Sequence, residues 1–406
     1  MAVRRRLVEQ TLLLTFAQLL ALAVGFVATV VIARALGPEG RGLYAWLLTL
    51  TAIAIQLAAL ASTQTVRAIA GEFGGEPGFA ATLVALSILG SLLGLPLLAY
   101  AWSGLPAGLD PTLLAVAWAA VPLSAAAVSL IPLVHIQERP WPILCAHLGP
   151  RVGLLLGAGT LWAAGRLDVA TAIWLNTVAA ALQFTVLIAL VPGRHRLRPR
   201  LALARSVARL LGAGWAGSLA VFVMPRAPLV MLAGSGMVPE AGHYSIAIAL
   251  FEIMTVLPVA ASGVLTSHLV DAPGARPGLR GIMGLAGLMA AACGVALLAA
   301  PVLVPLLFGA AFRPAVGAFQ ALLVAVMLAT VYQFCQGILH ARGRPSHILG
   351  PPLLALLTAG PISFMAIPTI GLYGAVLATV CGFAVLAGVA VWLAFRHPRP
   401  ASASVG

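Results

Sequence analysis

The chain has 406 residues, of which 62% are hydrophobic and 8% are charged, and its mean hydropathy is +1.07. A soluble domain is about 45–50% apolar and about 25% charged, so this composition excludes an ordinary soluble enzyme, a nucleic-acid-binding protein and a disordered chain. The net charge of +13 does not indicate nucleic acid, because no folded soluble part remains to present a basic face. We therefore expect a membrane protein with no nucleic-acid partner.

Apolar stretches long enough to cross a bilayer, roughly 20 residues each, follow one another along the chain. The first comes after three arginines, as in a signal peptide, but its apolar run over residues 11–33 has the length of a span, so we predict an uncleaved helix. Prolines inside later spans predict kinks at Pro96, Pro122, Pro225 and Pro258. The twelve predicted spans are 10–34, 43–65, 80–102, 111–134, 143–164, 169–191, 207–233, 242–268, 280–306, 315–338, 347–367 and 371–395.

The arginines are distributed unevenly over the predicted loops. All 23 basic residues are arginine; with the amino terminus inside, seventeen fall on the cytoplasmic side, four fall outside and two lie within spans. Cytoplasmic loops of membrane proteins carry such an excess, so we predict that both termini are cytoplasmic. The richest segment, 194–200, joins the sixth and seventh spans, and we interpret it as a topology anchor beside anionic lipid.

Two short patterns recur at a separation of about two hundred residues. Pro-Glu followed by Gly-x-Tyr begins at Pro38 and again at Pro239, and His-x-x-x-Arg-Pro-x-x-Ile-Leu begins at His135 and again at His340. Chance and shared turn chemistry are the alternative explanation, but two collinear matches favour duplication of a six-helix half. We predict an all-α polytopic membrane protein with two six-helix bundles, residues 1–195 and 196–406, related by a pseudo-twofold axis along the membrane normal.

No catalytic or cofactor motif stands out. The sequence has no Walker-type glycine loop, its loop acids are isolated, and its four cysteines lack metal-site spacing, so we expect buried thiols, no metal and no cofactor. A membrane enzyme or an assembly scaffold remains a weaker alternative to a transporter.

Four groups of residues resemble motifs of one transporter family. They are residues 33–39 with Gly42 and Tyr44, residues 307–309 with Phe312, residues 341–345, and residues 367–368 with Gly371, Gly374, Ala375, Ala378 and Thr379. Over nearly the whole chain the sequence resembles bacterial polysaccharide transporters, the O-antigen-type flippases of lipid-linked oligosaccharide. These belong to the multidrug/oligosaccharidyl-lipid/polysaccharide exporter superfamily, which also contains multidrug and toxin extrusion transporters and the peptidoglycan-precursor flippase.

The resemblance implies a flippase in the bacterial inner membrane that moves undecaprenyl-pyrophosphate-linked oligosaccharide to the outer leaflet by alternating access, for cell-surface polysaccharide biosynthesis. Its partners would be this substrate, membrane lipid and, by the same resemblance, a polysaccharide polymerase or glycosyltransferases. The alternative is a cation-coupled multidrug exporter on the same scaffold. Cations in the transport cavity favour the flippase, whereas carboxylates favour the exporter.

Anionic head groups need cations in a polar cavity, and the planar guanidinium of arginine suits phosphate. Arg226 and Arg151 lie roughly 10 Å and 12 Å inside their spans, at 1.5 Å per residue. Arg34 and Arg41 near the outer mouth and Arg67 near the inner end of the second span are candidates to escort the head group, although topology explains them equally well.

Glu252 is the one carboxylate that we place deep within a span. It has two interpretations: an ion pair with Arg226 that merely neutralises two buried charges, or a coupling or substrate-binding role. Uncharged polar residues in spans could line a sugar path, although most such residues make interhelical hydrogen bonds. The candidates of this kind are Asn176, Gln56, Gln183 and Gln333.

Overall fold

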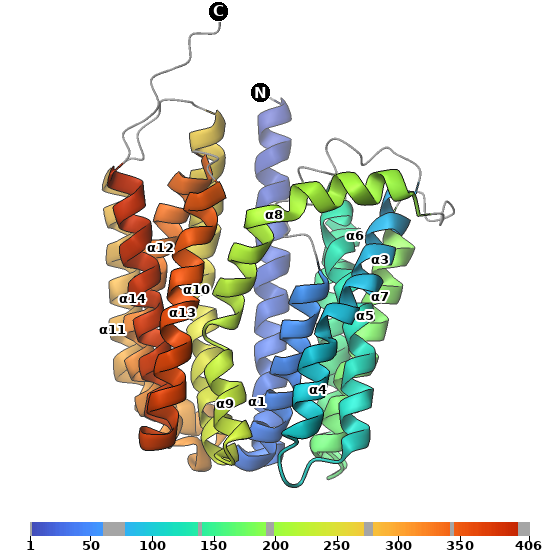
Figure 1. Ribbon diagram of the computed structural model, residues 1–406, viewed down its shortest axis with the longest axis vertical. Coiled ribbons are helices and arrows are strands. Elements are labelled where there is room, and N and C mark those ends of the chain that lie inside the picture. Colours follow the sequence, from blue (N-terminus) through green and yellow to red (C-terminus); the bar gives the residue numbers. More distant parts are fainter. Residues whose placement is uncertain are drawn as a thin grey trace, which may run out of the picture. The chain divides into compact units, whose positions relative to one another are not determined.

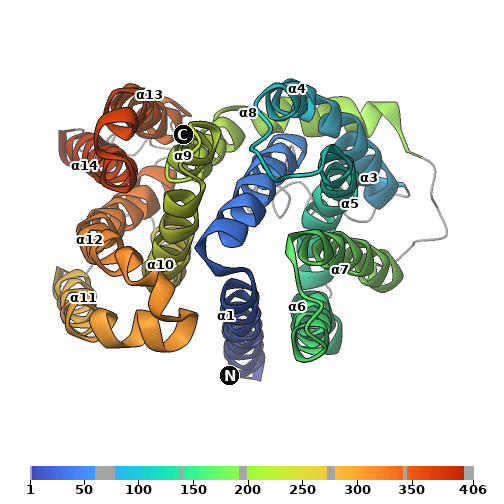
Figure 2. The same cartoon turned by 90° about the horizontal axis from the view of Figure 1, so that it is seen from below.

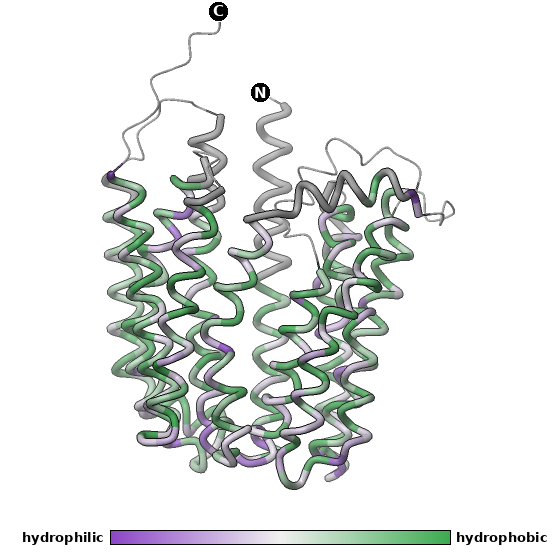
Figure 3. Tube along the Cα trace, viewed as in Figure 1, coloured by the Kyte–Doolittle hydropathy of each residue, from purple (hydrophilic) through white to green (hydrophobic). Residues whose placement is uncertain are grey.

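The computed structural model describes residues 2–59, 78–136, 140–191, 199–271, 279–341 and 345–396. Within these ranges the chain is built from helices and contains no strand (Figure 1). Hydrophobic residues dominate the middle of the helices, and hydrophilic ones gather towards their ends (Figure 3). The chain divides into two compact units, each of which collects segments from more than one part of the sequence.

The first unit contains residues 1–215 together with 229–245 and 305–312. Its elements are α1 (Ala2–Ala58), α3 (Phe79–Gly90), the 3-10 turn η1 (Ser91–Gly94), α4 (Leu95–Ser103), α5 (Pro111–Ile136), α6 (Pro140–Ala163), α7 (Val169–Leu190) and most of α8 (Leu201–Val223). Here α1 packs against α5 and α6, while α3 and α7 both pack against α5 (Figure 2). Apolar side chains such as Trp46, Leu114 and Ile173 are fully buried between them.

Two short segments from later in the sequence complete this unit. They come from α9 (Ala227–Gly234), from the first turns of α10 (Val238–Asp271), and from the end of α11 (Leu279–Phe308) with the following 3-10 turn η2 (Ala310–Phe312). The ring of Phe308 meets that of Phe26 edge to face at 5.9 Å. The Leu-Phe-Gly motif of the sequence is therefore a packing element against α1.

The second unit contains residues 216–228, 246–304 and 313–406. It holds most of α10 and α11 together with α12 (Pro314–Ala341), α13 (Pro345–Ile370) and α14 (Leu372–Arg396). The last helix packs against both α12 and α13, and half of its residues are small or apolar side chains buried in these contacts. The rings of Phe251 of α10 and Phe383 of α14 are tilted by 51° to each other, with their centres 5.2 Å apart.

Gly37 divides α1 into two membrane crossings. Its backbone, with φ of 65° and ψ of −178°, is not helical, and Pro38 follows it. The apolar stretch Leu19–Ala58 has 40 residues, which is about 60 Å of helix, or twice the hydrocarbon thickness of about 30 Å. The predicted first and second spans therefore lie on either side of this glycine.

Nine helices of the described chain are long and apolar enough to cross a membrane, or ten if the bent pair α8 and α9 forms one span. The two crossings within α1 add one more. The helix α6, whose apolar turns are interrupted by His147 and Arg151, is not among these apolar helices, so the predicted span 143–164 stays a prediction. The all-α polytopic fold is confirmed. The boundary between bundles at residue 195 stays a prediction.

The turns of the two halves repeat in the same order. Gly37 and Gly236 have φ values of 65° and 82°, a left-handed conformation that favours glycine because it has no Cβ. Left-handed glycines follow in corresponding turns of the two halves, at Gly108 and Gly309 and at Gly165 and Gly371. The separation stays near two hundred residues throughout, so the repeat seen in two sequence motifs extends to the turn geometry.

Candidate functional site

Arg226 lies where the seventh predicted span is broken. The helix α8 ends at Val223 and α9 begins at Ala227, and their axes differ by 43°. Pro225 and Pro228 flank the arginine and lack the backbone N–H that a continuous helix would use, so the break follows from the sequence. The predicted kink at Pro225 is thus a complete interruption, and such breaks in membrane helices line binding sites in transporters.

The structure brings Arg226 and Glu252 together within the second unit. Nη2 of Arg226 lies 2.5 Å from Oε1 of Glu252, and Nη1 donates to the carbonyl of Phe222 at 3.0 Å. The guanidinium carbon also lies 3.7 Å from the centre of the Phe222 ring. The side chain of Arg226 is 21% exposed and that of Glu252 is 44% exposed, so the carboxylate is the more accessible partner.

Arg151 has a different environment, on α6 of the first unit. Its side chain is exposed, and none of the described residues forms a hydrogen bond or an ion pair with it. The guanidinium lies beside Gly25 of α1: a Cβ added to that glycine would lie 2.5 Å from Nη1. Gly25 therefore leaves room for the head of Arg151, which is a cation within the predicted span 143–164.

Arg34 forms hydrogen bonds with the end of another helix. Its Nε donates to the carbonyl of Leu307 at 2.7 Å, and its Nη2 donates to the carbonyl of Leu306. These carbonyls belong to the last turn of α11, where a helix has unsatisfied acceptors and a partial negative charge. The contacts give Arg34 a structural role as a helix cap.

Arg41 is buried rather than presented at a mouth. Its side chain is 9% exposed, its Nε donates to Oγ of Ser245 at 3.1 Å, and its guanidinium carbon lies 5.5 Å from the centre of the Tyr44 ring. Ser245 donates in turn to the carbonyl of Gly242 at 2.7 Å. Tyr44 and Gly242 belong to the two copies of the Pro-Glu and Gly-x-Tyr pattern, and Ser245 directly follows the second copy.

The two copies of that pattern pack directly against each other inside the first unit. A Cβ on Gly42 would overlap the carbonyl of Val238, and one on Gly242 would overlap the carbonyl of Pro38. The glycines are therefore required for close approach of the backbones. Sequence reasoning treated the repeat as evidence of duplication and missed this contact, although a glycine at the same register in both copies was its signal.

The remaining candidates have less to distinguish them. Arg67 lies outside the described residues. All four uncharged polar candidates are half-buried. The backbone carbonyl of Gln56 accepts from Trp215 and that of Gln333 from Ser262, at 3.3 Å and 2.7 Å. A sugar-contacting role for the side chains of Asn176, Gln56, Gln183 and Gln333 stays a prediction.

No protein-family model matches the chain, and no curated protein matches it either. Solved structures do. The eukaryotic MATE transporter AtDTX14 has a TM-score of 0.68 at 14% identity, over 97% of each chain. The lipid II flippase MurJ in an inward closed conformation has a TM-score of 0.70 at 13% identity, over 95% of this chain and 87% of that one.

An inward-facing multidrug resistance MATE family transporter of the MOP superfamily matches with a TM-score of 0.67 at 15% identity, over 92% of this chain and 93% of that one. These likenesses establish that the chain has the polytopic helical fold shared by MATE transporters and MurJ.

Proposed function

We propose that this protein is a flippase of the bacterial inner membrane that moves an undecaprenyl-pyrophosphate-linked oligosaccharide from the cytoplasmic to the outer leaflet by alternating access. The single observation that carries the proposal is Arg151, an exposed cation on α6, the predicted fifth span, with which no described residue forms an ion pair. Charged residues at such depth usually face a bundle interior or a water-filled cavity. The fold shared with MurJ and the sequence motifs add support.

The chemistry of the substrate explains what Arg151 does. A diphosphate cannot cross hydrocarbon with its charge unpaired, so its path must offer hydrogen-bond donors of positive charge. The planar guanidinium presents two parallel N–H groups to two phosphate oxygens and remains charged at every accessible pH. Arg151 binds the diphosphate directly. No enzymatic step and no cofactor is part of this mechanism.

Arg226 contributes in a second, conditional way. It is already bound to Glu252, so a phosphate must compete with the carboxylate for Nη2. Glu252 thereby sets how strongly Arg226 attracts the head group.

The experiment assigns the leaflet of the lipid-linked oligosaccharide in cells that lack this protein and every other flippase. Spheroplasts are treated with a membrane-impermeant glycan-labelling reagent. Labelling of the oligosaccharide should be lost in the deletion strain. Re-expression of the parent protein should restore it, whereas expression of Arg151→Ala should not. Arg166→Ala, which removes an exposed loop arginine, is the matched control and should restore labelling. Full labelling in the deletion would overturn the proposal.

A second pair of variants tests the position of the guanidinium. Gly25→Ala keeps Arg151 but places a Cβ 2.5 Å from its Nη1, so the guanidinium must move away and transport should fall. Gly159→Ala on α6 meets no atom within 4 Å and should leave transport unchanged. Equal transport by both glycine variants would remove Arg151 from the substrate path.

The alternative is a cation-coupled exporter of small cationic molecules. The observation that favours it is Glu252, a carboxylate within a span whose side chain is 44% exposed. An exporter of this kind should lower the cellular accumulation of a fluorescent cationic dye, and Glu252→Gln should abolish that effect. Normal leaflet assignment in the deletion together with such dye export would replace the flippase by the exporter.

A further inference from the structure

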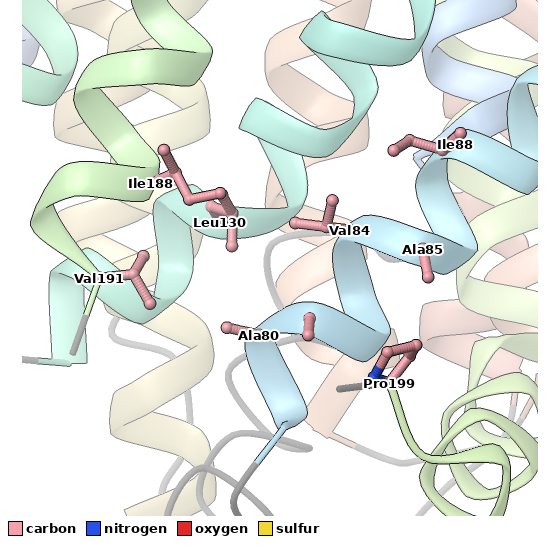
Figure 4. Close-up of a pocket in the computed structure, with 9 residues that line it drawn as sticks. Ala80, Val84, Ala85, Ile88, Leu130, Ile188, Val191 and Pro199 are labelled. Atoms are coloured by element: carbon pink, nitrogen blue, oxygen red, sulfur yellow. The ribbon is translucent and has the colours of Figure 1, made fainter. Parts of the chain in front are cut away.

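An apolar pocket opens between α3, α5 and α7 in the first unit (Figure 4). Its volume is about 200 Å³. The side chains that line it are hydrocarbon, and they include Ala80, Val84, Ile88, Leu130, Ile188 and Val191. A water molecule needs two to four polar partners, and an engineered apolar cavity of about 150 Å³ stays dry and takes up benzene. The lining thus favours a hydrocarbon occupant. Scaling from benzene, with six carbons in about 150 Å³, the pocket has room for roughly eight carbons.

The pocket lies at one end of the unit. The helix α3 begins beside it, α5 and α7 end beside it, and the first turns of α8 run across that end (Figure 1). The amino terminus of α1 lies at the same end (Figure 1). A pocket at this depth adjoins the head-group region of one leaflet, which the arginine distribution predicts to be the cytoplasmic leaflet.

A basic residue follows the pocket lining directly in the chain. Pro199 lines the pocket, and the next residue, Arg200, is exposed. The backbone N–H of Arg200 donates to Oγ1 of Thr82 at 3.0 Å, and Thr82 donates to the carbonyl of Gly78 at 2.8 Å, so the chain is tied to the start of α3. Leu203 in the first turn of α8 is buried in the same apolar cluster as Leu83.

We propose that this pocket binds one acyl chain of an anionic phospholipid, with Arg200 at its phosphate. The apolar lining accounts for the chain and Arg200 for the charge, since a basic residue beside the membrane surface attracts anionic lipid. A polyprenyl chain fits less well, because every isoprene unit carries a methyl branch. The bound lipid would hold the first turns of α8 against α3 and α7.

This site contains neither Arg151 nor Arg226, so it goes beyond the proposed flippase function and does not depend on it. The test uses the full chain in lipid nanodiscs with a phosphatidylglycerol that carries a photoreactive diazirine in mid-chain. After illumination, cross-linked peptides are mapped by mass spectrometry. Cross-links should concentrate on residues 80–88 and 188–191, and the matching phosphatidylcholine probe should give about fivefold fewer, as expected for one basic residue near the membrane surface.

Variants test the apolar pocket and Arg200 separately. Val84→Phe fills the pocket and should abolish the cross-links, whereas Val84→Ala enlarges it and should keep them. Arg200→Gln should lower phosphatidylglycerol labelling about fivefold, to the phosphatidylcholine level, without changing the pocket. Leu182→Phe on α7, whose side chain is 43% exposed, is a control for a general change of the lipid-facing surface and should have no effect.

Three results would overturn the proposal. Equal labelling by the anionic and the neutral probe would show that Arg200 recognises no charge. Unchanged labelling in a folded Val84→Phe protein would place the probe elsewhere. Displacement of the probe by a polyprenyl phosphate, but not by excess phosphatidylglycerol, would assign the pocket to the tail of a lipid-linked substrate. Should Val84→Phe fail to fold, the Arg200→Gln comparison still decides the charge requirement.

Discussion

The guanidinium of Arg226 shows how one partly buried charge is stabilised by three kinds of contact. It has an ion pair with Glu252, a hydrogen bond to the carbonyl of Phe222 and a cation–π contact with the ring of that residue. Removing one member of a charge pair inside a membrane protein leaves the other unpaired in a medium of low dielectric constant. Loss of Arg226 should therefore be more harmful than loss of the charge on Glu252, because Arg226 retains two other contacts.

A double-mutant cycle at the residue scale tests this pairing. Arg226→Ala should destabilise the detergent-solubilised protein more than Glu252→Gln does, and the double variant should be less destabilised than the sum, by about 1 kcal/mol. Thermal unfolding midpoints of the four proteins measure the difference. Strict additivity would mean that the two side chains do not interact in the folded protein.

At the scale of the element, α7 begins with a complete capping box. Oδ1 of Asp168 accepts from the backbone N–H of Thr171 at 2.8 Å, and the hydroxyl of Thr171 accepts from the backbone N–H of Asp168 at 2.9 Å. The backbone N–H of Thr171 lowers the pKa of Asp168, and the hydroxyl of Thr171, which also donates to Oδ1, adds to that effect. The folded state thus favours the charged form.

We expect Asp168→Ala to cost about 1 kcal/mol of stability at pH 7. Because the pKa is lower in the folded state, the contribution of Asp168 is complete above its ordinary pKa of about 3.9 and is lost as the pH falls through the folded value. Asp168→Asn, which caps without titrating, should keep most of the stability at pH 7 and remove this acid dependence. Unfolding at pH 7 and in acid measures both, and an Asp168→Ala protein as stable as the parent at pH 7 would contradict the prediction.

The contact between the two copies of the Gly-x-Tyr pattern is the tightest helix approach that the glycines reveal in the first unit. In Gly242→Ala the new Cβ would overlap the carbonyl of Pro38. A backbone atom cannot change its position by rotamer change as a side chain can. We expect it to cost about 1–3 kcal/mol, as overpacking does, and to lower the yield of folded protein. The control is Gly388→Ala in α14, which meets nothing within 4 Å and should be neutral or slightly stabilising.

For the whole molecule, hydropathy and proline positions predicted the helices well. The reason is that a membrane helix must form its backbone hydrogen bonds within one apolar segment. The break at Pro225 follows from local sequence. Other prolines behave differently: α5 and α10 continue through Pro122 and Pro258, while a 3-10 turn precedes Pro96. Whether neighbouring helices support the freed carbonyls decides the outcome, and this is a tertiary property.

The candidate site was predictable in residue type but not in residue role. Depth within a span pointed to Arg226, Arg151 and Glu252, and the ion pair was one of two stated interpretations. Arg34 and Arg41 looked equivalent in sequence, yet one caps α11 and the other is buried beside Ser245. Those partners lie about two hundred residues or more away in the chain, and no local pattern reveals contacts at such separation.

The orientation of the whole molecule yields the last prediction. An excess of arginine marks the cytoplasmic side, so both termini should face the cytoplasm and the turns at Arg166 and Arg313 should face outside. In a background with the four cysteines replaced by alanine, a single cysteine is introduced at Arg166, Arg313 or Ser402. An impermeant maleimide should label the first two in intact spheroplasts and the third only after permeabilisation. The reverse pattern would mean that the protein is inverted and that the phospholipid pocket lies in the outer leaflet. Opposite labelling at positions 166 and 313 would mean an odd number of spans between those two positions.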